Sequence, residues 1–178
     1  MEILEVFNAN DYVPFDYNYR PTAKAIIIDE ENRIALMPGM PGGGVEQGET
    51  FEQALHRECM EELGMTIEII RSIGRVEQYR DAIKMHYVVQ GFIARKVGEL
   101  VKPTSTDPDD IKSNFQNRLQ WLSFDDAVLF TKERVKKLER GESVYTFDET
   151  KKDDYFQSRI YSAKMVLIFL EQIKNTLD

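Results

Sequence analysis

The hydrophobic positions along this chain of 178 residues form short blocks whose spacing predicts several strands. Residues 23–29, AKAIIID, form an apolar block, and a second strand is expected to begin at Arg33 after a polar turn. Residues 65–79 alternate between apolar and polar side chains and predict one long or kinked strand, with residues 84–97 as its partner. Residues 119–122 predict a further short strand.

A helical spacing extends from Phe51 to Leu63. Thr50 stands in the position of an N-cap, and Gln53 three residues later completes a capping-box pattern. Gly64 can end the helix in a left-handed conformation. The core-facing side of this helix is expected to carry Phe51, Ala54, Leu55 and Cys59.

The last part of the chain predicts a loop followed by two helices. Residues 98–117 contain prolines and a cluster of Thr, Ser and Asp, and predict a long polar loop. A helix is expected to begin near Phe124 with Ser123 as its cap, and a last helix to span about residues 152–175. The last helix carries a wide apolar face made of Phe156, Ile160, Ala163, Met165, Val166, Leu167, Ile168, Phe169, Leu170, Ile173 and Leu177. This face predicts either a homodimer interface or packing on the core of the same chain.

Composition and charge exclude several classes of protein. The chain has 31 Asp and Glu against 23 Lys and Arg, and the net charge of −8 argues against a groove for long nucleic acid, which needs a basic face. Cys59 is the single cysteine, so a disulfide within the chain is impossible and a reducing compartment is expected. The N-terminus is unlike a signal peptide, and no apolar run is long enough to cross a bilayer. We therefore expect a cytoplasmic protein without a membrane partner.

The most informative segment is GGVEQGETFEQALHRECMEELGM, residues 43–65. Within it, helical spacing places Glu58, Glu61 and Glu62 on one side of the predicted helix, and no basic side chain is expected on that side. Like charges at this spacing repel, and a hard divalent cation such as Mg²⁺ would offset the repulsion because it takes oxygen ligands and bridges to phosphates. The glycines before the helix let the backbone bend and leave its polar groups open to a ligand.

The spacing of this segment, G-x5-E-x7-R-E-U-x-E-E-x-G-U with U a bulky apolar residue, resembles the signature of the Nudix hydrolases. The resemblance covers roughly residues 21–140 and implies a fold of the α/β (α+β) class, a mixed β-sheet sandwiched between α-helices. Residues 1–20 would then form an aromatic-rich N-terminal extension, and residues 141–178 a C-terminal helical extension. Two departures are Cys59, where the family prefers Ile, Leu or Val, and the lack of a glutamate in residues 101–132.

The chemistry that the resemblance implies is hydrolysis of a pyrophosphate bond in a nucleoside diphosphate linked to another group X, by attack of water on phosphorus. Mg²⁺ is the implied cofactor, with Mn²⁺ as a substitute, and the implied partner is a small nucleotide-type substrate. The implied metal ligands are Gly43, through a carbonyl of the turn, and Glu58, Glu61 and Glu62. The implied catalytic set is Glu49, Arg57, Glu58 and Glu62, with Arg57 pairing with Glu49 to fix the loop against the helix.

An alternative function is a catalytically inactive Nudix-fold module that senses a nucleotide. The complete set of acidic residues favours the enzyme, since a sensor has no need to keep all three carboxylates. The general base is expected within the acidic segment, with Glu49, Glu58 and Glu62 as candidates.

Further residues are candidates for substrate contacts. Tyr17 and Tyr19 share one face of an extended segment that ends in Arg20, so they could stack on a base or pack at a dimer interface. Asp109 and Asp110 lie in the long loop, to which we assign a substrate-gating role.

Overall fold

The computed structural model describes residues 2–8, 16–37, 39–142 and 152–174, with the side chains of residues 8, 82, 109, 110, 112 and 152–156 outside the description. The described strands form one sheet in the order β1-β4-β5-β2-β3-β6. Their bounds are β1 (Ile3–Asn8), β2 (Asn18–Ile28), β3 (Ile34–Leu36), β4 (Thr66–Arg80), β5 (Met85–Val97) and β6 (Gln120–Leu122). β1 runs parallel to β4 and β2 parallel to β5, whereas the other neighbours are antiparallel, so the sheet is mixed.

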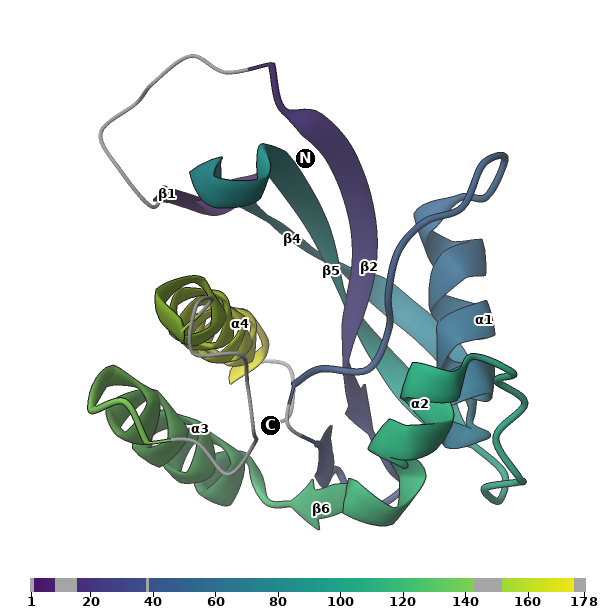
Figure 1. Ribbon diagram of the computed structural model, residues 1–178. Coiled ribbons are helices and arrows are strands. Elements are labelled where there is room, and N and C mark those ends of the chain that lie inside the picture. The colour runs from purple at the N-terminus through teal and green to yellow at the C-terminus, as the bar shows by residue number, and fades with distance from the viewer. Residues whose placement is uncertain (1, 9–15, 38, 143–151, 175–178) are drawn as a thin grey trace.

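Helices cover both faces of this sheet (Figure 1). Their bounds are α1 (Phe51–Leu63), α2 (Pro108–Ser113), α3 (Phe124–Glu139) and α4 (Lys152–Ile173). Side chains on β2 alternate between two cores, because Ala23 and Ala25 belong to the cluster that packs against α1, while Ile26 belongs to the cluster of α4. The predicted fold class, a mixed sheet between helices, is therefore confirmed.

The approach of α4 to the sheet depends on Gly91 in β5. The ring of Phe169 lies so close over this glycine that a side chain there would overlap it. Large apolar side chains of α4 within the described ranges are all buried or partly buried, and the exposed positions are polar. The structure therefore uses the apolar face for packing inside the chain, and the homodimer stays a prediction. Leu177 and the side chain of Phe156 lie outside the described residues.

The predicted strands are all present, but β2 is longer than expected. The strand begins at Asn18 and continues through Pro21. Proline fits here because it has no backbone N–H that would need a partner, and its carbonyl accepts the N–H of Val45 at 3.0 Å. β1 is a strand of the sheet, and α4 packs against that sheet. The division of the chain into a central domain and two extensions, with boundaries at residues 20/21 and 140/141, stays a prediction. None of the described helices is both long and apolar enough to cross a bilayer.

The prediction of a long polar loop over residues 98–117 is wrong for the second half of that segment. The segment contains α2 and a 3-10 turn at Gln116–Arg118, since Pro108 at the first helical position has a backbone angle already suited to a helix. Before α2 the backbone is anchored to the end of α1, where Val101 N–H donates to the Gly64 carbonyl at 2.9 Å and Ser105 N–H to the Glu61 carbonyl at 3.2 Å. These bonds use carbonyls that a helix end leaves without partners.

The caps of α1 are formed as predicted. The Thr50 hydroxyl accepts the Gln53 N–H at 3.2 Å, and the Gln53 side chain accepts the Thr50 N–H at 2.8 Å. Gly64 ends the helix with φ of 60° and ψ of 35°. The start and the end of the acidic helix are thus fixed by local bonds.

We predict that Thr50→Ala lowers the free energy of unfolding by about 1 kcal/mol, because the first turn of α1 loses its side-chain acceptor. Urea unfolding followed by circular dichroism measures the effect. Thr106→Ala, at an exposed loop position, is the matched control and should leave the midpoint unchanged. Equal midpoints for both variants would show that the cap does not stabilise the fold.

Candidate active site

The glycine-rich turn before α1 is held along the edge of β2. The Gly43 carbonyl accepts the Ala23 N–H at 2.9 Å, and the Pro41 carbonyl accepts the Ala25 N–H at 3.1 Å. A Cβ at Gly43 would overlap the carboxyl group of Glu58, so a larger residue there would displace that carboxylate from the turn. The turn and the acidic helix are therefore in direct contact.

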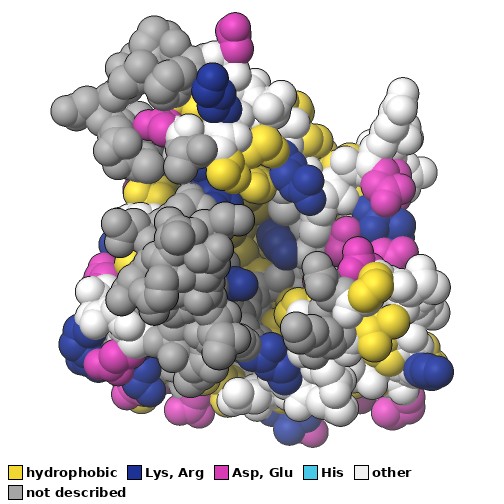
Figure 2. All heavy atoms as spheres, in the orientation of Figure 1, with side chains coloured by type: hydrophobic (Ala, Val, Ile, Leu, Met, Phe, Trp, Pro, Cys, Tyr) yellow, Lys and Arg dark blue, Asp and Glu magenta, His cyan; other side chains and the backbone are white. Residues whose placement is uncertain are grey.

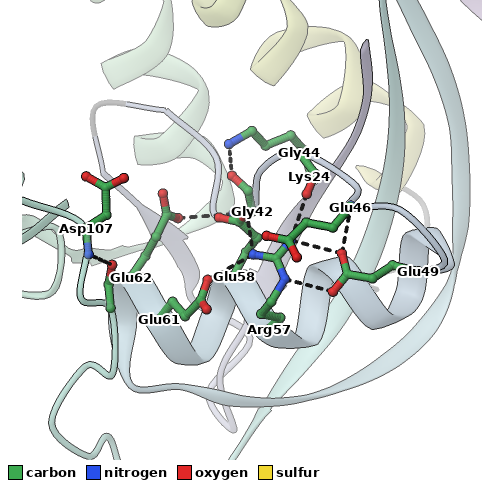
Figure 3. A network of polar contacts seen from close by, with 11 residues as sticks. Lys24, Gly42, Gly44, Glu46, Glu49, Arg57, Glu58, Glu61, Glu62 and Asp107 are labelled. Carbon is green, nitrogen blue, oxygen red and sulfur yellow. Dashed lines mark hydrogen bonds and ion pairs between the residues drawn. The ribbon is translucent and has the colours of Figure 1, made fainter. Parts of the chain in front are cut away.

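The guanidinium of Arg57 lies at the centre of this contact (Figure 3). It donates to both oxygens of Glu49, at 2.8 and 3.0 Å, and to the Gly44 carbonyl at 2.8 Å. Its remaining donors reach Glu58 and Glu61, each at 2.9 Å. The pairing of Arg57 with Glu49 is present, and it joins the turn to the helix.

The expectation that the acidic side of α1 carries no basic partner is wrong. Arg57 stands one residue before Glu58 and four before Glu61, and its side chain bends toward both carboxylates. Helical spacing allows the second contact, but the first depends on the rotamer that the turn and Glu49 impose. The carboxylates are therefore partly neutralised within the chain itself.

The surroundings raise the pKa of some side chains at this site and lower that of others. Burial raises the pKa of Glu58, and the hydrogen bond and charge of Arg57 oppose that rise only in part. The hydrogen bond from Arg57, followed by that from the Glu46 N–H, lowers the pKa of Glu49. Burial also raises the pKa of the Cys59 thiol to about 12, so this residue is a neutral part of the core.

Lys24 belongs to this site, although the sequence analysis did not select it. Its ammonium group donates to the Gly42 carbonyl, and the Gly42 N–H reaches a carboxylate oxygen of Glu62 at 3.3 Å (Figure 3). The signal was a lysine between two alanines, inside the apolar block of residues 23–29. A lysine within such a strand has to find a partner or a cavity.

Two cavities open beside Glu62. The larger, of about 440 Å³, lies between the end of α1 and the anchored loop and is lined by Glu61, Glu62, Lys102, Pro103, Thr104, Ser105, Ile111, Asn114, Phe115 and Gln116. The smaller, of about 130 Å³, lies between β2 and α4 and is lined by Lys24, Met37, Gly39, Met40, Glu62, Phe115, Arg159, Ser162 and Met165. Glu62 and Phe115 line both, so the acidic helix faces each cavity.

The carboxylate and carbonyl oxygens of this site fit a magnesium ion that is bound by both protein and phosphate. Within the described ranges, no group of three or more metal-binding side chains forms a ready-made cage. Mg²⁺ is commonly held by one or two carboxylates together with water and substrate phosphates, which needs no such cage. The side chain of Glu58 is mostly buried against Gly43, whose carbonyl keeps a second lone pair beside its bond to Ala23.

The predicted substrate residues lie in three different settings. Tyr17 donates its hydroxyl to Asp81 at 2.6 Å, and Tyr19, 61% exposed, lies edge-on to His86. Neither tyrosine lines the two cavities beside Glu62. Arg20 is exposed and its guanidinium lies beside Gly44. Asp109 and Asp110 were expected in a loop but belong to α2, and their side chains lie outside the described residues.

The sequence pattern of the NUDIX domain matches residues 18–146. The chain belongs to the Nudix family. MutT4 of Mycobacterium tuberculosis (strain CDC 1551 / Oshkosh) is 32% identical over 76 residues, which are 42% of this chain and 31% of MutT4. The matched segment thus spans about a third of the length of that relative.

Solved structures show the same fold. The MutT protein from Methanosarcina mazei Go1 superposes with a TM-score of 0.50 at 17% identity, over 85% of this chain and 99% of that chain. A NUDIX hydrolase from Nitrosomonas europaea gives a TM-score of 0.50 at 18% identity, over 83% of this chain and 95% of that chain. At these identities the likeness concerns the Nudix fold.

We predict that Arg57→Met lowers the free energy of unfolding by about 2 kcal/mol in the presence of EDTA, because partly buried carboxylates lose their hydrogen-bonded counter-charge. Urea unfolding measures the change. Arg140→Met is the matched control, since Arg140 and its partner Glu142 are 60% and 53% exposed and their pair is screened by water. The control should leave the midpoint unchanged, and equal effects of the two variants would contradict the role given to Arg57.

Proposed function

We propose that this Nudix protein hydrolyses the pyrophosphate bond of a nucleoside diphosphate linked to another group X, in a reaction that depends on Mg²⁺ or Mn²⁺. The observation that supports this most is the position of three carboxylates on one side of α1. Glu58 lies against the glycine turn, and Glu61 and Glu62 line a cavity of about 440 Å³. A cavity of that size lies in the range of small-molecule sites.

The residues of the chain would have distinct tasks in this reaction. Glu58, Glu61 and Glu62, with the Gly43 carbonyl, would hold the cation, which when bound neutralises phosphate charge and lowers the pKa of water. Arg57 would fix the turn and two of the carboxylates in place, since it already bonds to all of them. Phosphoryl transfer depends mainly on such positioning and on charge neutralisation.

The proposed general base stays within the acidic segment. Both oxygens of Glu49 accept hydrogen bonds from Arg57, and one also accepts the Glu46 N–H at 2.9 Å. Glu49 is therefore better suited to positioning the turn than to acting as the base. Glu58 and Glu62 remain as candidates, and Glu62 faces both cavities. A base has to lie within hydrogen-bond reach of the attacking water.

We predict that Glu61→Gln and Glu62→Gln reduce turnover by roughly a hundredfold or more, the upper range known for residues that support a metal site. The fold should survive, because each change removes one charge from a crowded acidic face. Turnover is measured on nucleotide sugars, dinucleoside polyphosphates, ADP-ribose and oxidised nucleoside triphosphates. Glu133→Gln, exposed on α3, is the control.

Removal of the cation supplies the second arm of this test. EDTA should abolish turnover, and added Mg²⁺ or Mn²⁺ should restore it. Full turnover in EDTA would refute the metal-dependent reaction. Tight nucleotide binding without turnover of any substrate would instead support the sensing module.

We also predict that Asp109→Asn and Asp110→Asn raise KM and spare kcat, because the proposed role of their loop is to admit substrate. Steady-state kinetics on the best substrate separates the two parameters. Asp125→Asn, at an exposed position of α3, is the control. A fall in kcat of roughly a thousandfold, with metal affinity intact, would move the general base into the loop.

A further inference from the structure

The smaller cavity brings together two cations from β2 and α4, elements that are far apart in the sequence. Lys24 lies on β2 between Ala23 and Ala25, which pack against α1, so its side chain projects from the face of the sheet that turns toward α4. Arg159 and Ser162 come from α4 and stand three residues apart, on one side of that helix. Figure 2 shows the molecule hollowed between α4 and β2, with Lys and Arg side chains on the walls of the hollow.

The charge of this cavity differs from that of the chain as a whole. The net charge of −8 repels a phosphate, and α1 adds three carboxylates at the site itself. Among the residues that line the smaller cavity, Lys24 and Arg159 are cationic and Glu62 is the acidic one. A phosphate that lies beside Glu62 therefore gains a favourable interaction on the side of β2 and α4.

The sizes of the two cavities indicate which part of a substrate each can take. The cavity of about 130 Å³ is the smaller of the two, and it has room for a compact anion such as a phosphate. The cavity of about 440 Å³ is large enough for a group of drug-like size. Since Glu62 and Phe115 line both, a diphosphate that joins the two groups would pass directly beside Glu62.

We propose that Lys24 and Arg159 form a phosphate-binding subsite, with Lys24 on β2 and Arg159 on α4. This subsite takes one phosphate of the substrate, while the bulkier organic group occupies the larger cavity. It rests on the proposed function. Arg159 lies beyond residues 18–146, the part of the chain that matches the NUDIX domain, so the C-terminal helix completes a site that the domain alone leaves open on one side.

The test is binding of methylenediphosphonate, whose P–C–P linkage cannot be hydrolysed, measured by titration calorimetry on the full chain with Mg²⁺ present. Lys24→Met and Arg159→Met should each weaken binding about tenfold or more, the effect of losing one charge-assisted hydrogen bond. Lys164→Met is the matched control, because Lys164 is on the same helix, pairs with Glu139 at 3.0 Å and does not line the cavity. The control should change affinity by less than about twofold.

Arg159 decides the outcome, because Lys24→Met could also disturb the turn through the lost bond to the Gly42 carbonyl. Arg159→Met with unchanged affinity overturns the subsite, even if Lys24→Met binds weakly. Partial rescue by Arg159→Lys, which keeps the charge, supports it. Circular dichroism of each variant shows whether the fold is retained.

Binding of methylenediphosphonate needs no turnover, so the experiment can refute the subsite without refuting the hydrolase, and the reverse. A wild-type chain that binds methylenediphosphonate through both cations, yet cleaves none of the nucleoside diphosphate derivatives, keeps the subsite and refutes the hydrolase. An active hydrolase whose Arg159→Met variant binds the probe like the wild type refutes the subsite. In steady-state kinetics on a substrate that the wild type cleaves, Arg159→Met should raise KM more than it lowers kcat.

Discussion

The hydrogen bonds of a single guanidinium hold the acidic site together. Arg57 has a planar fork of donors, and it uses them on Glu49, on the Gly44 carbonyl and on two carboxylates of its own helix. Crowded carboxylates would otherwise repel one another and destabilise α1. Since Arg57 offsets part of this repulsion, the helix can keep its charges facing the turn before any cation binds.

β2 is the element around which the rest of the site is arranged. One face of the strand packs against α1, the other faces α4, and its edge pairs with the glycine turn through Ala23 and Ala25. The acidic helix, the turn and Lys24 are therefore positioned by the same backbone. The loop that follows β5 completes the wall on the far side, because Val101 and Ser105 bond to carbonyls at the end of α1. These bonds hold the part of the loop before α2 against the end of α1.

The sequence by itself determined the features that depend on neighbours along the chain. The capping box of Thr50, the left-handed Gly64 and the core-facing side of α1 follow from bonds and spacings within one helix. The spacing from Gly43 to Gly64 likewise indicated the Nudix family, which the match to the NUDIX domain shows. Periodicity also located the long strands β4 and β5 as an antiparallel pair.

Tertiary structure alone decided how these elements meet. It turned Arg57 toward Glu58, continued β2 through Pro21, and folded part of a polar loop into α2. It also brought Arg159, far along the chain from Lys24, to the same cavity. Side-chain direction and contacts between distant segments depend on how complete helices and sheets pack, and no local pattern of residues encodes that packing.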